Sequence, residues 1–413
     1  MQLCSVVKSL ALDKRFRGLI ALKMTAYDLS YATRWNQIQV RALSDPRLRG
    51  IPKVQRSPRI ANYMRLSFGS RSRILNMENT FENAKKDEDE LVNGEKTEKR
   101  LNAFEYFKLH RSDEDLDLSG WSLDKVTASG ISMELPSCAN IVRLSLANSS
   151  LKDEGGKIIA KGLEENFSVR ELDLTGNMLG ENAISAIGEM LNKNQTLEKL
   201  NLSRNNLTDH DVQVFLNCLC RKTFLKDLDL SSNILCDQFA KQMSFVLEKN
   251  FVLEKLSIYS NQLEASGLQA ISSGLRKTKT LSFLNISWNY LRDAGAEILG
   301  EIIAENRGLV EISACGNLLT TQSTRSLATG VSSNSKLKVL RIGQNLIKNS
   351  GAYEFVKVLF ESGKPISLET LDINGTIVDR RFKELIETGL PENLSSLKVV
   401  NFSVVECFVN KTT

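Results

Sequence analysis

Histidine and paired cysteine are both scarce in this chain of 413 residues. The only histidines are His110 and His210, so the sequence offers few residues for histidine-based catalysis or metal binding. The seven cysteines are mostly isolated, so neither a disulfide framework nor a four-ligand metal site is indicated. Cys218 and Cys220 are two residues apart, a spacing that points their side chains to different sides of a helix and favours a structural role. We therefore expect a reducing compartment and no metal.

Long apolar runs and catalytic motifs are absent as well. No uninterrupted apolar run approaches about 18 residues, so no transmembrane helix is predicted. Lys8, Asp13 and Arg15 interrupt the apolar core that a secretory signal would need. No phosphate loop, nucleophile elbow, zinc-protease helix or dinucleotide fingerprint occurs. The sequence predicts a cytoplasmic protein that has no catalytic residues, no cofactor and no contact with a membrane.

The charge is unevenly distributed along the chain. Residues 1–75 carry a net charge of +12 and residues 76–413 a net charge of −7. We expect residues 1–95 to be a basic, largely disordered extension that ends in a mixed-charge linker, and residues 96–413 to form a second domain. The extension is interpreted as a flexible tail with weak affinity for acidic partners, an organelle-targeting presequence, or a segment that docks on its own domain. We do not expect specific nucleic-acid binding, because no basic module with interleaved aromatic residues is present.

An internal repeat covers most of the second domain. The motif L-x-x-L-x-L-x-x-N-x-L recurs every 28 residues. Its copies begin at Ile141, Val169, Leu197, Leu225, Leu253, Leu281, Leu309 and Leu337. One degenerate copy precedes them and two follow with longer spacing. About eleven units therefore cover residues 109–407.

Each unit predicts a strand, a turn and a helix. In RELDLTGNML, Leu172 and Leu174 alternate with Glu171 and Asp173, so the leucines point into a core and the acidic residues point outward. The second half of a unit carries apolar residues at helical spacing, as in Ile184, Ile187 and Leu191. Stacked units of this kind predict an α/β solenoid, a curved horseshoe with a parallel sheet on the concave face and helices on the convex face.

Asparagines recur at two places in the unit. The ninth motif position predicts a ladder of buried amides that satisfy backbone groups of neighbouring units. This ladder consists of Asn177, Asn205, Asn233, Asn261, Asn289, Asn317 and Asn345. A second set stands near the ends of the helices, where we expect the left-handed conformation that asparagine tolerates. This set consists of Asn166, Asn194, Asn250, Asn306 and Asn334.

The period and the motif resemble the ribonuclease-inhibitor type of leucine-rich repeat, over about three quarters of the chain. More narrowly, LDLSSN, LNISWNYLRDAGA and LETLDINGTIVDRRFKELI resemble the leucine-rich-repeat-containing protein 74 group. The resemblance implies the horseshoe fold and brings little mechanism with it. Terminal units depart from the pattern: Trp121, Thr376 and Val405 stand where the ladder asparagine is expected. We interpret these departures as capping variations.

The concave face is the expected recognition surface. Its exposed row at the fifth motif position includes Asp173, Asp229 and Arg341, with mostly acidic and neutral residues in the early units. This row favours a basic segment of a partner protein. Asp173 and Asp229 lie two units apart, about 10 Å, and we do not expect them to act as a catalytic pair.

Aromatic residues are concentrated in the middle units. Tyr259 stands at the seventh motif position of its unit, and Phe283 and Trp288 at the third and eighth of the next. Tyrosine and tryptophan are enriched at interaction hot spots. The three residues therefore predict a partner-binding patch, with the alternative that Trp288 folds over its turn as a packing cap. Tyr290, on the turn, is expected to pack along a neighbouring unit.

These observations favour a monomeric, non-enzymatic scaffold or adaptor that binds a partner protein on its concave face. The alternative is a regulatory protein similar to the GTPase activator of Ran, which is built from repeats of this type. Such a protein would be expected to have a strongly acidic C-terminal tail, whereas this sequence ends in NKTT.

Overall fold

The computed structural model describes residues 101–221, 223–388 and 390–405. The chain divides into two units, Met1–Glu98 and Lys99–Thr413. The first unit lies outside the described residues, so the prediction of a basic, largely disordered extension over residues 1–95 stays a prediction. The description below concerns the second unit alone.

Eleven parallel strands of the second unit form one sheet, and their order in the sheet follows the chain. Neighbouring strands pair without slippage, as Glu171 with Lys199 and Asp173 with Asn201. In this sheet the strands are β1 (Asp115–Asp117), β2 (Arg143–Ser145), β3 (Glu171–Asp173), β4 (Lys199–Asn201), β5 (Asp227–Asp229), β6 (Lys255–Ser257), β7 (Phe283–Asn285), β8 (Glu311–Ser313), β9 (Val339–Arg341), β10 (Thr370–Asp372) and β12 (Lys398–Val400). A separate two-stranded sheet pairs β11 (Ile377–Asp379) with β13 (Ser403–Val405).

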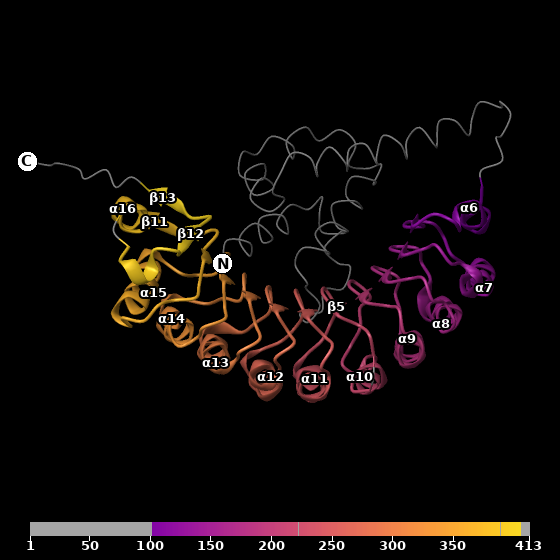
Figure 1. Ribbon diagram of the computed structural model, residues 1–413, viewed down its shortest axis with the longest axis horizontal. Coiled ribbons are helices and arrows are strands. Elements are labelled where there is room, and N and C mark those ends of the chain that lie inside the picture. Colours follow the sequence, from indigo (N-terminus) through magenta and orange to yellow (C-terminus); the bar gives the residue numbers. More distant parts are fainter. Residues whose placement is uncertain (1–100, 222, 389, 406–413) are drawn as a thin grey trace, which may run out of the picture. The chain divides into compact units, whose positions relative to one another are not determined.

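Helices lie on the outer side of the arc of strands (Figure 1). They are α6 (Ala103–His110), α7 (Lys125–Glu134), α8 (Lys152–Leu163), α9 (Glu181–Lys193), α10 (Gln213–Leu219), α11 (Asp237–Lys249), α12 (Ala265–Lys277), α13 (Arg292–Glu305), α14 (Thr324–Ser332), α15 (Asn349–Glu361) and α16 (Arg380–Thr388). Short 3₁₀ helices span η3 (Leu135–Ser137), η4 (Thr321–Ser323) and η5 (Glu392–Leu394). The predicted α/β solenoid of about eleven units is therefore confirmed.

The core is a continuous layer between the strands and the helices. Leu172 and Leu174 are buried, while Glu171 and Asp173 on either side of Leu172 are partly exposed, as the alternation predicts. The predicted helical stripes, including Ile187 of α9, are also buried. Full burial of one such leucine contributes about 1.5–3 kcal/mol, but each unit needs its neighbours to complete that burial.

Aspartates link successive helices in a way that the sequence analysis did not anticipate. Asp153, in the first turn of α8, accepts hydrogen bonds through Oδ1 from the backbone N–H groups of Gly180 (3.1 Å) and Ala183 (2.7 Å). These groups belong to the N-terminus of α9, where the capping residue Gly180 has no side chain to offer. Asp293 bonds the N–H of Thr320 in the same way, at 2.7 Å. One unit thus caps the helix of the next.

The prediction of left-handed asparagines at the helix ends was wrong. None of the five has a positive φ, and Asn194 is extended, with φ −69° and ψ 132°. Its side-chain nitrogen donates to the carbonyl oxygen of Leu163 (2.8 Å), and its oxygen accepts from the N–H of Leu197 (2.8 Å). The extended backbone directs the chain toward the next strand, and the amide satisfies groups left free at the end of the preceding helix. The second set of asparagines is therefore a second ladder between units.

Non-repeating residues cover the ends of the core. Trp121, which replaces the ladder asparagine in the first unit, packs against Tyr106 of α6 with ring centroids 5.2 Å apart. Phe107 of the same helix is buried, so α6 shields the first unit from solvent. At the other end Thr376 is buried in the place of the asparagine, whereas Val405 is exposed.

Candidate functional site on the inner face of the sheet

The turn that leaves each strand is held by the asparagine at the ninth position. The side-chain nitrogen of Asn205 donates to the carbonyl oxygens of Leu174 and Leu202, both at 3.0 Å. Its oxygen accepts from the backbone N–H groups of Asn177 (2.8 Å) and Leu179 (3.3 Å) in the preceding unit. These contacts use the amide to pair buried backbone groups of adjacent units, which is a role in the fold and not in binding.

Asp173 and Asp229, expected to contact a partner, are also turn residues. Oδ1 of Asp173 accepts from the N–H (2.9 Å) and the hydroxyl (2.5 Å) of Thr175. Oδ1 of Asp229 accepts from the N–H of Ser231 at 2.8 Å. The signal was readable, because an aspartate followed two residues later by serine or threonine is typical of this turn. One oxygen of each carboxylate is therefore committed to the fold.

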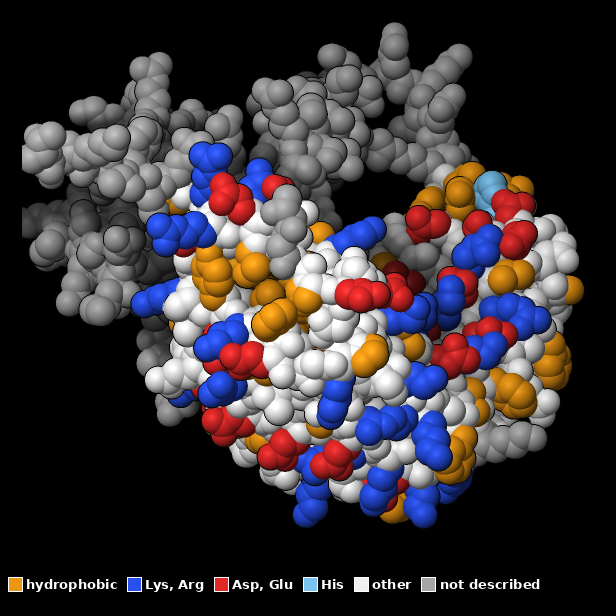
Figure 2. Space-filling view, turned by 60° about the vertical axis from the view of Figure 1, so that its left-hand side comes forward, with side chains coloured by type: hydrophobic (Ala, Val, Ile, Leu, Met, Phe, Trp, Pro, Cys, Tyr) orange, Lys and Arg blue, Asp and Glu red, His pale blue; other side chains and the backbone are white. Residues whose placement is uncertain are grey.

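The first residues of the strands form a row of alternating charge, which the sequence analysis missed. The row runs through Asp115, Arg143, Glu171, Lys199, Asp227 and Lys255. Lys199 lies 2.7 Å from Glu171, and Arg143 pairs with Asp115. Burial raises the pKa of Asp227, while the charges of Lys255 and Lys199 act in the opposite direction. Charged side chains of both signs are interleaved in this part of the molecule (Figure 2). In the early units, acidic residues therefore predominate in the fifth-position row, whereas the row of first strand residues carries both signs of charge.

Arg341 is paired on the inner face. Its guanidinium contacts Glu311 on the neighbouring strand and lies 3.5 Å from the hydroxyl of Ser313. The carboxylate of Glu311 cancels the charge of Arg341 at this point of the face. Arg341, a candidate partner contact of the exposed row, is thus part of a local ion pair.

The three aromatic residues expected to form one patch lie at two different levels of the sheet. Phe283 is the first residue of β7 and pairs with Lys255 and Glu311 in the row of alternating charge. Tyr259 and Trp288 follow the strand ends of their units. Phe283 stands at the third motif position, whereas Tyr259 and Trp288 stand at the seventh and eighth, beyond the ends of β6 and β7. Tyr259 and Trp288 are therefore the aromatic residues of the candidate site, and Phe283 lies apart from them.

Tyr259 is half-buried just beyond β6. Burial raises the pKa of its phenol, and the charge of Arg204 acts in the opposite direction. The seventh position holds Ser231 in the preceding unit and Ser287 in the following unit, so the repeat itself does not need an aromatic ring here. The aromatic ring of Tyr259 is therefore specific to this unit.

Trp288 has a backbone conformation that disfavours large side chains. Its φ is +58°, in the left-handed region. The eighth position has positive φ in each of these units, at Gly120, Asn148, Gly176, Arg204, Ser232, Ser260, Trp288, Gly316, Gln344 and Gly375. For residues other than glycine this conformation costs about 1–2 kcal/mol. A Cβ atom at Gly316 would lie 2.7 Å from indole Cδ2, so the ring packs closely on that glycine. The side chain of Trp288 is nevertheless 50% exposed.

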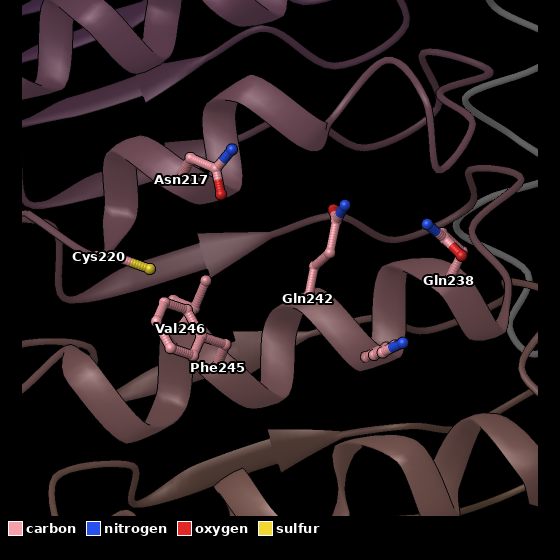
Figure 3. Close-up of a pocket in the computed structure, with 7 residues that line it drawn as sticks. Asn217, Cys220, Gln238, Gln242, Phe245 and Val246 are labelled. Carbon is pink, nitrogen blue, oxygen red and sulfur yellow. The ribbon is translucent and has the colours of Figure 1, made fainter.

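The pocket in Figure 3 lies elsewhere, between α10 and α11 on the helical side. Its volume is about 310 Å³, and its lining includes Cys220, Gln242 and Phe245. The buried Oε1 of Gln242 has no hydrogen-bond partner within the described residues. Burial raises the pKa of the Cys220 thiol, which disfavours the reactive thiolate form.

The described residues contain neither a metal-binding cluster nor a membrane-spanning helix. Within them, no group of three His, Cys, Asp or Glu side chains is arranged to hold a metal ion. No helix in the described ranges has the length and apolar character needed to cross a bilayer. Of the two cysteines expected to be structural, Cys218 is a buried free thiol and Cys220 a partly buried one.

Comparisons with known proteins give one family match. Residues 193–216, from the end of α9 through β4 into α10, match the family model described as Leucine Rich repeat. No curated protein matches the chain.

Three solved structures were compared with the chain. The structure of the yeast Rad7 and Elc1 complex is 16% identical, covers 81% of this chain and 98% of its own, and has a TM-score of 0.33. An internalin (inlF) from Listeria monocytogenes is 18% identical, with 72% and 84% covered and a TM-score of 0.42. The TLR13–ssRNA13 complex is 14% identical, with 72% and 42% covered and a TM-score of 0.37. The repeat period, the eleven-stranded parallel sheet and the matched segment make the described part of this chain a leucine-rich-repeat solenoid.

Proposed function

We propose that the protein is a non-enzymatic scaffold or adaptor that binds a partner protein on the inner face of its solenoid. The observation that carries the proposal is Trp288, a large, half-exposed side chain held in the left-handed conformation. Other units place glycine or polar residues of various sizes at this position, so the fold does not require tryptophan. A large aromatic side chain that is exposed on a strained backbone supports a binding role.

The partner is proposed to be a protein because the face is broad and is built from flat strands. Tyr259 and Trp288 stand in adjacent units and supply aromatic anchors for an interface. In the N-terminal units, the fifth-position row holds Asp117, Asp173 and Asp229 without a lysine or arginine in that row before Arg341. This row favours a basic segment of the partner there, contacted through the carboxylate oxygens that the turns leave unused.

The narrower assignments are proposals of the same kind. The 28-residue period and the quoted segments support the ribonuclease-inhibitor type of repeat and the leucine-rich-repeat-containing protein 74 group. A cytoplasmic location, a monomeric state and a basic extension over residues 1–95 complete the proposal.

Affinity capture with the full chain tests the binding role. Wild type is compared with Tyr259→Ser/Trp288→Gly, whose replacements are the residues that the repeat uses at the equivalent positions 231 and 316. Phe245→Ala, on the outer surface of α11, is the matched control, since Phe245 is 54% exposed. We expect the double variant to lose partners that wild type and Phe245→Ala retain, with unchanged melting of all three. Identical sets of captured proteins would refute the proposed site.

A further inference from the structure

A second surface lies on the turns that follow the asparagine ladder. Four consecutive units expose a large apolar side chain at the tenth position: Tyr290 (43%), Leu318 (42%), Leu346 (58%) and Ile377 (58%). We call these four residues the apolar ridge. Earlier units place Ser150, Asn206 and Gln262 at this position, interrupted by Met178 and Ile234. The ridge is therefore a feature of the C-terminal units and not of the repeat in general.

The backbone fixes the spacing of the ridge. The N–H of Tyr290 donates to the carbonyl oxygen of Leu263 (2.8 Å), and the N–H of Leu346 donates to that of Leu319 (2.7 Å). Tyr290 and Leu346 are thereby held against the preceding unit, and Ile377 lies within β11. Neighbouring units of a parallel sheet are about 4.8 Å apart, so the ridge presents one apolar side chain about every 5 Å. Hydrophobic side chains are visible on the C-terminal units in Figure 2.

The exposed Leu318 has a strained backbone conformation. Its φ is +61°, and four units earlier Asn206 has a φ of +58° at the same position. Asparagine tolerates the left-handed conformation, but leucine is strained in it. An exposed leucine in a strained conformation is not explained by folding, and this supports a binding role for the ridge.

Two exposed cations lie beside the ridge. Arg292 and Lys348 are exposed at the twelfth positions of their units, and within the described ranges neither has a carboxylate at salt-bridge distance. The nearby Asp293 and Asp379 are engaged by hydrogen bonds to Thr320 and to helix α16. The one exposed carboxylate on this edge, Glu264, lies beyond the Tyr290 end of the ridge. A partner that follows the ridge therefore meets two cations, Arg292 and Lys348, that are free to pair with its carboxylates.

We propose that the apolar ridge docks an amphipathic α-helix of a partner protein, with acidic residues along the edge that faces Arg292 and Lys348. A helix repeats its apolar face every 5.4 Å, close to the spacing of the ridge, whereas a strand repeats every 6.8 Å or so and falls out of step over three units. The basic N-terminal residues of this chain do not fit, because residues 1–75 carry a net charge of +12. The ridge is distinct from the inner-face site, so either can fail without the other.

The test uses a fluorescent amphipathic peptide of about 18 residues, with leucines on one face and glutamates beside them, titrated by anisotropy against the full chain. The variant Leu318→Asn/Leu346→Gln takes its residues from the equivalent positions 206 and 262 and should fold normally. Met178→Asn is the matched control, because Met178 occupies the same position with a positive φ outside the ridge. A second peptide carries lysine in place of glutamate.

We expect the ridge variant to bind the glutamate peptide about tenfold or more weakly than wild type and Met178→Asn do, and the lysine peptide to bind weakly to all. Tyr259→Ser should leave peptide binding unchanged, which separates this proposal from the inner-face site. The proposal is overturned if wild type does not bind the glutamate peptide, or if the ridge variant binds equally well. Self-association of wild type that the ridge variant abolishes would identify a second copy as the occupant and would also overturn it.

Discussion

The indole of Trp288 packs against Gly316, the residue at the same position in the next repeat unit. Both residues have positive φ, and only the glycine adopts it without strain. The backbone of Trp288 is therefore strained, and its ring is in close contact with the next unit. A double-mutant cycle can measure how much this contact contributes to the free energy of unfolding.

Gly316→Ala should lower the free energy of unfolding by about 2 kcal/mol, because the new methyl group meets the indole and alanine is strained at positive φ. Trp288→Gly should change it by less than about 1 kcal/mol, since the relief of strain offsets the lost packing of a half-exposed ring. Urea denaturation of both single variants and the double variant provides the measurement. In the Trp288→Gly background, Gly316→Ala should cost about 1 kcal/mol, from strain alone. Equal costs in both backgrounds would show that the contact carries no energy.

Asn205 should contribute far more to the stability of the fold than its neighbour Asn206. Asn205→Ala leaves buried carbonyl and N–H groups of two units unpaired, and we expect a loss of about 2–4 kcal/mol in the free energy of unfolding. Asn206 is exposed and has positive φ, so Asn206→Gly should change stability by less than about 0.5 kcal/mol. Urea denaturation curves of the two variants test the ladder, and similar midpoints for both would contradict it.

Glu164 gives a prediction for pH. Burial on its own raises the pKa of this carboxyl, but hydrogen bonds and charges from Lys161 (2.7 Å) and Lys193 (2.9 Å) outweigh burial and hold the pKa below its ordinary value. A group with a lowered folded-state pKa stabilises the fold above its unfolded pKa, about 4.3, and loses that contribution as pH falls through the folded pKa.

Glu164→Gln should therefore destabilise the protein at pH 7 by about 0.5–1 kcal/mol. The difference from wild type should shrink steadily below about pH 4. Thermal or urea unfolding at several pH values checks this, with Glu189→Gln, on the exposed side of α9, as the control. A difference that stays constant between neutral and acidic pH would mean that the ion pairs do not contribute.

The fold was predictable from sequence because every unit repeats the same chemical requirements. Leu172 and Leu174 alternate with polar residues at the two-residue spacing of a strand. Ile187 belongs to a set of apolar residues at the spacing of a helix. These two periods specify which segment is a strand, which is a helix, and which face of each is buried. Stacking follows, because no single unit of 28 residues can bury its apolar face alone. Period and motif therefore specified the solenoid without knowledge of any individual contact.

The site was less predictable because its properties depend on contacts between residues about 28 apart. The charge of Arg341 is cancelled by Glu311 of the preceding strand, and Asp173 is engaged by its own turn. Asn194 was misjudged because its amide bonds to groups of the previous unit, which no local propensity records. The strain at Trp288 did leave a signal, since glycine stands at the equivalent Gly176 and Gly316.

Photo-crosslinking from position 288 tests the central claim most directly. A benzoylphenylalanine replaces Trp288 in the full chain, and in a second protein it replaces Phe245, an outer-surface aromatic of similar exposure (54% against 50%). Each protein is irradiated with the partners captured by wild type. Binding on the inner face predicts a covalent adduct with a partner protein from position 288 and none from position 245. Adducts from position 245 alone, or equal adducts from both positions, would contradict it.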